Sequence, residues 1–239
     1  MVNILRAIRG WGETRTLRVR QNRDGGLMVG YRAFRGQSLL CLVTICFITI
    51  LAVTIGPVSS ARAAGYSAIV LDAESGRVLH AHEADTLRYP ASLTKMMTLY
   101  MAFDALKDGR LKLDQRIPVS AHAAGQPPSA IGLRAGGSLT VRGAILAAVT
   151  KSGKGATVAL GGAIGGSEAR FAEMMTQRAR QLGMSNTTFK NASGLPNPKQ
   201  KSTARDMATL ALALLQKHKS YYTYFSTPEF EWNDRVFNN

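Results

Sequence analysis

A charge-free apolar stretch near the N-terminus restricts most strongly which part of this chain can fold as a globular domain. The stretch "LLCLVTICFITILAVTI" (39–55) follows an arginine-rich segment (1–37) and precedes the tripeptide Ala61-Arg62-Ala63. A positive segment, an apolar segment and a small-x-small tripeptide, in that order, are typical of an export signal. We therefore expect residues 1–63 to be a cytoplasmic n-region and signal peptide, and residues 64–239 to be an exported domain.

The apolar stretch is close to the length that spans a bilayer, so an uncleaved signal anchor is the competing interpretation. In both cases the arginine-rich end stays in the cytoplasm and the remainder is exported. This predicts a periplasmic domain that contacts the inner membrane through its signal or anchor segment. Met28 would give a more ordinary start to such a signal.

Cysteine usage and charge narrow the function classes of the exported part. Both cysteines, Cys41 and Cys46, lie in the apolar stretch, so no disulfide can stabilise residues 64–239. That part carries 21 lysines and arginines against 13 acidic residues. A basic exported domain favours an anionic envelope polymer or a membrane surface as partner. Nucleic acid is not an expected partner, because no nucleic-acid-binding motif or aromatic platform is present.

Periodicity and turn signals predict strands first and helices afterwards. Residues 66–85 alternate like two strands around a tight turn at 74–77, whereas 111–141 is rich in loop signals. A long amphipathic helix is expected from Ser92 to near Gly109. Further helices are expected at 142–150, 156–166, 167–184 and 203–219. Ser167 and Thr203 are suitable N-caps for the last two, with Asp206 at the capping-box position after Thr203.

Two histidines in the second predicted strand invite a metal-site interpretation. His80 and His82 are two residues apart and therefore lie on the same face of a strand. No third ligand is suggested by the sequence, so we favour solvated strand histidines and expect neither a metal ion nor an organic cofactor.

The stretch "YPASLTKMMT" (89–98) places Ser92 three residues before Lys95. If a helix begins at Ser92, the two side chains meet on one face. Serine needs a nearby base to act as a nucleophile, and a desolvated lysine can be that base because burial lowers its pKa. The alternative is a capping serine beside a solvated lysine, and Ser-x-x-Lys alone does not decide between them.

Several further stretches, in the right order, resemble the serine D-alanyl-D-alanine carboxypeptidases of peptidase family S11, the low-molecular-mass penicillin-binding proteins. They are "AIVLDAESGRVLHAHEAD", "RYPASLTKMMTLYMAFDAL", "VSAHAAGQPPSAIGLRAGGSLTVRGAILAAVTKSG" and "FKNASGLPNP…TARDMATLA". The resemblance covers about residues 66–239. It implies an α/β (α+β) fold of the DD-peptidase/β-lactamase-like transpeptidase type, with a helical cluster and an antiparallel sheet.

The resemblance also implies a reaction and its residues. Ser92 would form an acyl-enzyme, Lys95 would accept its proton, and Ser152 would relay a proton to the leaving group. The substrate would be a peptidoglycan stem peptide ending in D-Ala-D-Ala, which loses its terminal D-alanine. β-Lactams would acylate the same serine in a full-length relative.

This sequence departs from the family's pattern in two places. The second box, Ser-x-Asn in the family, reads Ser152-Gly153-Lys154, so a lysine stands where an asparagine would bind substrate. A second cation would lower the pKa of Lys95 further, but an ammonium group has no acceptor to replace the amide. The third box, Lys-Thr-Gly, is expected beyond residue 239, so we expect an incomplete sheet and little or no turnover.

Three alternatives remain open on the sequence. The chain could be a catalytically inactive, peptidoglycan-binding remnant that holds envelope polymers by its basic surface. It could be a serine β-lactamase, which shares the Ser-x-x-Lys start, although no deacylating glutamate is evident. Finally, Ser92 could simply cap a helix while Lys95 is solvated.

Overall fold

The computed structural model describes residues 65–127 and 131–239. The predicted signal segment, its cleavage site and both cysteines lie outside these residues. Within the described ranges, no helix combines the length and the apolar character needed to cross a membrane. The described residues form one compact unit.

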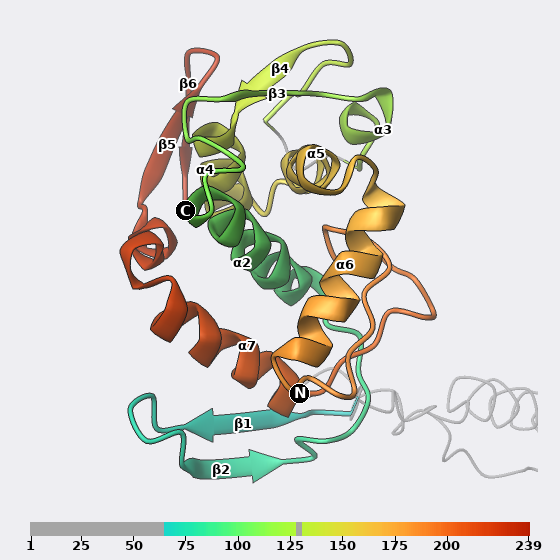
Figure 1. Cartoon of the computed structure of the whole chain (residues 1–239), viewed down its shortest axis with the longest axis vertical. Coiled ribbons are helices and arrows are strands. Elements are labelled where there is room, and N and C mark those ends of the chain that lie inside the picture. Colours follow the sequence, from blue (N-terminus) through green and yellow to red (C-terminus); the bar gives the residue numbers. More distant parts are fainter. Residues whose placement is uncertain (1–64, 128–130) are drawn as a thin grey trace, which may run out of the picture. The chain divides into compact units, whose positions relative to one another are not determined.

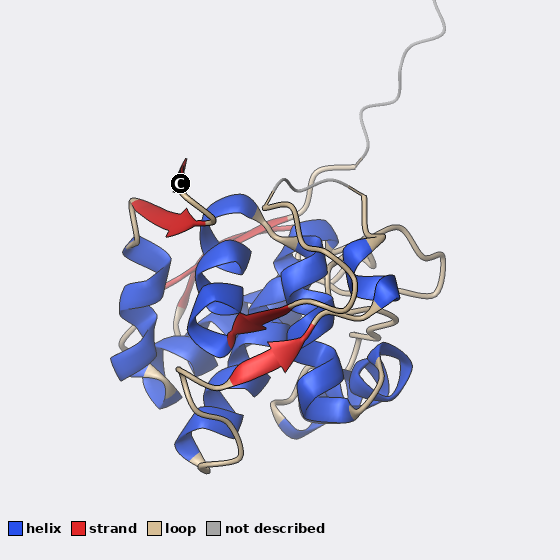
Figure 2. Cartoon of the chain, turned by 90° about the horizontal axis from the view of Figure 1, so that it is seen from above, coloured by secondary structure: helices blue, strands red, loops and turns tan. Residues whose placement is uncertain are grey.

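The unit combines a group of helices with three separate antiparallel strand pairs, β1–β2, β3–β4 and β5–β6 (Figures 1 and 2). This agrees with the predicted α+β class and its helical cluster. In chain order the elements are β1 (Ala68–Leu71), β2 (Val78–His82), η1 (Ala91–Leu93), α2 (Thr94–Lys107), β3 (Arg116–Pro118), α3 (Ala121–Ala124), β4 (Ser138–Thr140), α4 (Val141–Lys151), α5 (Lys154–Gly165), α6 (Glu168–Gln181), α7 (Ala204–Lys217), η2 (Lys219–Ser226), β5 (Glu229–Trp232) and β6 (Arg235–Asn238).

Helix α2 occupies the centre of the unit, with α5, α6 and α7 packed around it (Figure 1). Ten of its fourteen residues are buried, among them Met97 and Phe103, which are fully inaccessible. The prediction of an amphipathic helix is therefore wrong, because α2 has no broad solvent face. Its α-helical part also begins later than predicted: Ser92 lies in the preceding 3₁₀ turn η1, and α2 begins at Thr94.

Helix α5 contains two adjacent glycines, Gly161 and Gly162, which are unfavourable in the interior of a helix. A Cβ atom at Gly161 would lie 2.7 Å from Cδ1 of Phe171 in α6, whereas one at Gly162 would meet nothing within 4 Å. Gly161 is thus required by close packing of α5 on α6, and Phe171 is fully buried there. The packing of a large ring against a helix backbone offsets the helix-propensity cost of the glycine.

Both predicted N-caps are confirmed, but the role of Asp206 is not the predicted one. Ser167 Oγ accepts from the Arg170 N–H, and Thr203 Oγ1 accepts from the Asp206 N–H at 3.1 Å. The Asp206 carboxylate does not complete a capping box. It accepts instead from the Asn186 N–H at 2.9 Å and the Thr187 hydroxyl at 2.7 Å, tying the loop before α7 to that helix.

The opening hairpin agrees with the prediction for residues 66–85. β1 pairs with β2 so that Ala68 faces His82 and Val70 faces His80, which puts both histidines on one exposed face. Within the described residues β1 pairs with β2 alone, and β2 is exposed throughout. The hairpin lies against α7 (Figure 1).

Two strand pairs were not predicted. The region 111–141 forms the short pair β3–β4 within its loops, and the C-terminal residues form β5–β6 against α4 (Figure 1). The β5–β6 turn is made by Asn233 and Asp234, both with positive φ. Such a two-residue turn matches the twist of paired strands, and asparagine and aspartate tolerate its left-handed conformation.

Candidate active site

Ser92 lies on the 3₁₀ turn that leads into the buried central helix. Pro90 precedes this turn, and the Leu93 N–H donates to its carbonyl at 3.1 Å. Ala91 has a φ of +46°, a left-handed conformation that residues other than glycine rarely adopt. Backbone strain of this kind is concentrated at functional sites. The turn leaves Ser92 exposed at the end of a helix that is otherwise buried.

Gly194 packs directly on this strained turn. Its φ is +87°, and a Cβ atom added there would lie 1.8 Å from the Ala91 carbonyl oxygen. Both observations restrict the position to glycine. The segment around Gly194 can therefore approach the backbone of Ser92 as closely as it does only with this residue.

Lys95 lies one turn further along, and only 4% of its surface is exposed. Its Nζ donates to Ser92 Oγ at 3.2 Å and to the Ser193 carbonyl oxygen at 2.5 Å. Burial, and then the positive charge of Lys154, lower the pKa of Lys95 from 10.5 to about 8. These are the two causes that the sequence analysis expected to act on Lys95. An amine with such a pKa is partly unprotonated near neutral pH and can act as a base.

Ser152 reaches the same place from α4. It is the C-cap residue directly after α4, in a left-handed conformation with φ of 53°, and α5 begins two residues later. Its Oγ lies 3.2 Å from Ser92 Oγ. The structure therefore brings Ser92, Lys95 and Ser152 into one chain of hydrogen bonds, although their sequence positions are up to 60 residues apart.

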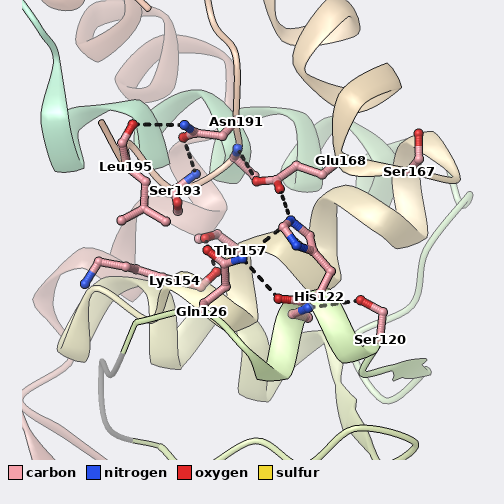
Figure 3. A network of polar contacts seen from close by, with 12 residues as sticks. Ser120, His122, Gln126, Lys154, Thr157, Ser167, Glu168, Asn191, Ser193 and Leu195 are labelled. Atoms are coloured by element: carbon pink, nitrogen blue, oxygen red, sulfur yellow. Dashed lines mark hydrogen bonds and ion pairs between the residues drawn. The ribbon is translucent and has the colours of Figure 1, made fainter. Parts of the chain in front are cut away.

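Lys154 is the first residue of α5 and is half-buried. It lies near enough to Lys95 for its charge to lower the Lys95 pKa. In Figure 3 its side chain extends away from Glu168 and His122. Lys154, the fourth predicted site residue, thus lies next to the group formed by Ser92, Lys95 and Ser152, and adds a second positive charge beside Lys95.

The sequence analysis did not identify the contacts made by the segment 191–194. Asn191 Oδ1 accepts from the Gly194 N–H at 2.7 Å, and its Nδ2 donates to the Leu195 carbonyl at 2.9 Å. The Asn191 amide thereby shapes the turn around Ser193 and Leu195 (Figure 3). The Ser193 carbonyl of this turn accepts from Lys95. The available signal was the pair Asn191 and Gly194, since asparagine commonly bonds backbone groups two or three residues on.

Glu168 was also missed, because an acid in the first turn of a helix has an ordinary explanation in the helix dipole. Its Oε1 accepts from the Ala192 N–H at 3.0 Å, and its Oε2 contacts His122 Nε2 in α3. No local pattern predicts a contact across 24 residues of sequence.

The described residues contain no group of three or more histidine, cysteine, aspartate or glutamate side chains that could hold a metal ion. His80 and His82 remain a pair on the exposed face of β2.

The chemistry available to the Ser92 group is nucleophilic. Ser92 lies between an amine that can take its proton and a second hydroxyl that can pass a proton on. A hydroxyl in contact with a free amine can give up its proton to that amine and attack an acyl carbon. An ester results when the acyl group's original substituent leaves with a proton.

Comparison with known proteins agrees with this geometry. The family model for D-alanyl-D-alanine carboxypeptidase (peptidase S11) matches residues 56–239. The chain is 36% identical over 163 residues to D-alanyl-D-alanine carboxypeptidase DacF of Bacillus subtilis. The aligned part covers 68% of this chain and 42% of DacF. The chain thus spans less than half the length of that curated relative.

Solved structures show the same fold. Penicillin-binding protein 5 from Haemophilus influenzae superposes with a TM-score of 0.69 at 33% identity, covering 72% of this chain and 51% of its own. Penicillin-binding protein D2 from Listeria monocytogenes, in its ampicillin-bound form, gives a TM-score of 0.60 at 28% identity, covering 72% and 70%. The chain belongs to the D-alanyl-D-alanine carboxypeptidase family, peptidase S11.

Proposed function

We propose that this chain carries the acylating part of a serine-type D-Ala-D-Ala carboxypeptidase. Ser92 attacks the carbonyl carbon between the two D-alanines of a peptidoglycan stem peptide, and Lys95 accepts the hydroxyl proton. Ser152 relays a proton to the leaving amine, so that D-alanine departs and an ester to Ser92 remains. Water then hydrolyses this ester. Lys154 contacts the substrate in place of the family's asparagine.

One observation carries the proposal: the Nζ of a buried lysine with a pKa of about 8 donates to the hydroxyl of an exposed serine. A purely capping serine beside a solvated lysine would not have this geometry. The ampicillin-bound structure of the Listeria relative supports β-lactams as ligands of the same site. Export of residues 64–239 to the periplasm, with the segment before them at the inner membrane, is part of the proposal.

Covalent labelling of the full chain with a fluorescent penicillin tests the proposal directly. We expect labelling of the folded chain, its loss in Ser92→Ala, and its retention in Ser226→Ala, which changes an exposed serine of η2. We expect turnover of a D-Ala-D-Ala peptide to be slow relative to labelling, because Lys154 replaces the amide of the second box. A folded chain that takes up no label would contradict the proposal.

A binding module is the second candidate, and the excess of basic residues in 64–239 favours it. Such a module would hold anionic envelope polymers without chemistry at Ser92. Binding to purified sacculi that survives Ser92→Ala, in a chain that takes up no penicillin, would favour this candidate.

A further inference from the structure

A carboxylate outside the Ser92 group supports the segment that contacts Lys95. Glu168 is the first residue of α6, and 14% of its side chain is exposed. One carboxylate oxygen accepts from the Ala192 N–H at 3.0 Å, and the other contacts His122, which is itself largely exposed. Figure 3 shows Glu168 between His122 and the 191–195 segment.

The segment is held from both sides. On the α2 side, the Ala192 carbonyl accepts from Thr98 Oγ1 at 2.7 Å and the Ser193 carbonyl accepts from Lys95 Nζ at 2.5 Å. On the α6 side, Glu168 binds the Ala192 N–H. The Ala192 N–H and the Ser193 carbonyl are separated by one peptide unit, the one whose carbonyl binds Thr98. Because planar peptides leave only two soft dihedral angles per residue, fixing the Ala192 N–H restricts the direction of the Ser193 carbonyl.

We propose that Glu168 is a positioning residue for Lys95: by binding the Ala192 N–H it fixes the Ser193 carbonyl, which in turn orients Lys95 Nζ toward Ser92. His122 holds the same carboxylate from its outer side. The effect of Glu168 on the acylation rate rests on the proposed function, whereas its effect on Lys95 itself does not. An acid that only stabilised the start of α6 would leave Lys95 unaffected.

The test compares variants of Glu168 in the full chain by two readouts. The first is the rate of acylation by a fluorescent penicillin. The second is the titration of Lys95, followed by NMR of lysines labelled with ¹³C at Cε and assigned by Lys95→Arg. Glu168→Ala removes the contact, and Glu168→Gln keeps an oxygen acceptor for Ala192. Glu173→Ala is the matched control, since it removes an exposed glutamate from the same helix.

We expect Glu168→Ala to slow acylation roughly tenfold, the effect of losing one charged hydrogen bond. The Lys95 pKa should fall below that of the unmodified chain, because an ammonium group loses a fixed carbonyl acceptor. Glu168→Gln should retain the Lys95 titration, and Glu173→Ala should change neither readout. Glu168→Asp keeps the charge but is one methylene shorter, so it should lower the Lys95 pKa even where the alanine variant does not fold.

The inference is overturned if Lys95 titrates identically in the folded alanine and aspartate variants, or if the glutamine variant moves the Lys95 pKa as far as alanine does. If the unmodified chain takes up no penicillin but its Lys95 still responds to Glu168, the positioning role stands and the proposed function fails.

Discussion

Replacing Lys154 by asparagine should raise the pKa of Lys95. The pKa of Lys95 falls from 10.5 to about 8, with burial as the larger cause and the Lys154 charge as the smaller. The total difference of about 2.5 corresponds to about 3 kcal/mol in favour of the free amine. Because Lys154 is the smaller of the two causes, Lys154→Asn should raise the Lys95 pKa by less than half of that difference.

Such a change has a measurable effect on the base. At pH 7 a lysine of pKa 8 is unprotonated in about a tenth of the molecules, and one of pKa 9 in about a hundredth. The same NMR titration of Lys95, together with the pH dependence of penicillin acylation, should therefore show a midpoint displaced upward in Lys154→Asn.

Lys151→Asn is the matched control for this experiment. Lys151 is exposed at the end of α4, and its charge is not among the causes of the lowered Lys95 pKa. Removing it should leave the midpoint in place. A midpoint that stays near 8 in Lys154→Asn, or that moves equally in both variants, would refute the assigned effect of Lys154.

Three further predictions concern stability, each measured by denaturant unfolding. Gly161→Ala should destabilise the fold by about 1–3 kcal/mol through overpacking, whereas Gly162→Ala, one residue on, should stabilise it by up to about 1 kcal/mol. Gly194→Ala should cost about 3 kcal/mol, and clearly more than Gly166→Ala, which has a similar positive φ but open space around it. Burial lowers the pKa of His218 below 6.5, so at mildly acidic pH this histidine binds a proton more readily in the unfolded chain than in the folded one. The free energy of unfolding should therefore fall as the pH drops below 6.5, and His218→Phe should weaken that pH dependence.

The helices were predictable because their signals are local. Ser167 and Thr203 cap α6 and α7 as their sequences indicate, and the apolar run 142–150 is helical. The strands β3 and β4 were not predictable, since three-residue strands carry too little alternation to stand out in a loop-rich region. The β5–β6 turn has a signal in Asn233-Asp234, but this pair is weaker than the Asn-Gly turns that mark most such hairpins.

The residues of the candidate site also divide into those with a local sequence signal and those without one. Spacing alone suggested that Ser92 and Lys95 meet, and the family's pattern added Ser152 and Lys154. Two contacts orient Lys95, and both join residues far apart in the sequence. Glu168 and Ala192 are 24 positions apart, and Lys95 and Ser193 are 98 positions apart. Only the packing of α2, α6 and the loop between α6 and α7 brings these residues together, so no sequence window contains them.

The lysine at position 154 acts on catalysis in two opposite directions, and their sizes decide the net effect. Its charge increases the free-amine fraction of Lys95 at pH 7 by less than about twentyfold, because it is the smaller cause of the lowered Lys95 pKa. An amide there would supply both a donor and an acceptor, and losing one preorganised polar group at a reacting centre typically costs about 10²–10³ in rate. The loss exceeds the gain. Lys154→Asn should therefore acylate faster than the unmodified chain at pH 7, even though fewer of its Lys95 side chains are unprotonated. A slower variant would show that the charge of Lys154, and not the missing amide, dominates at this site.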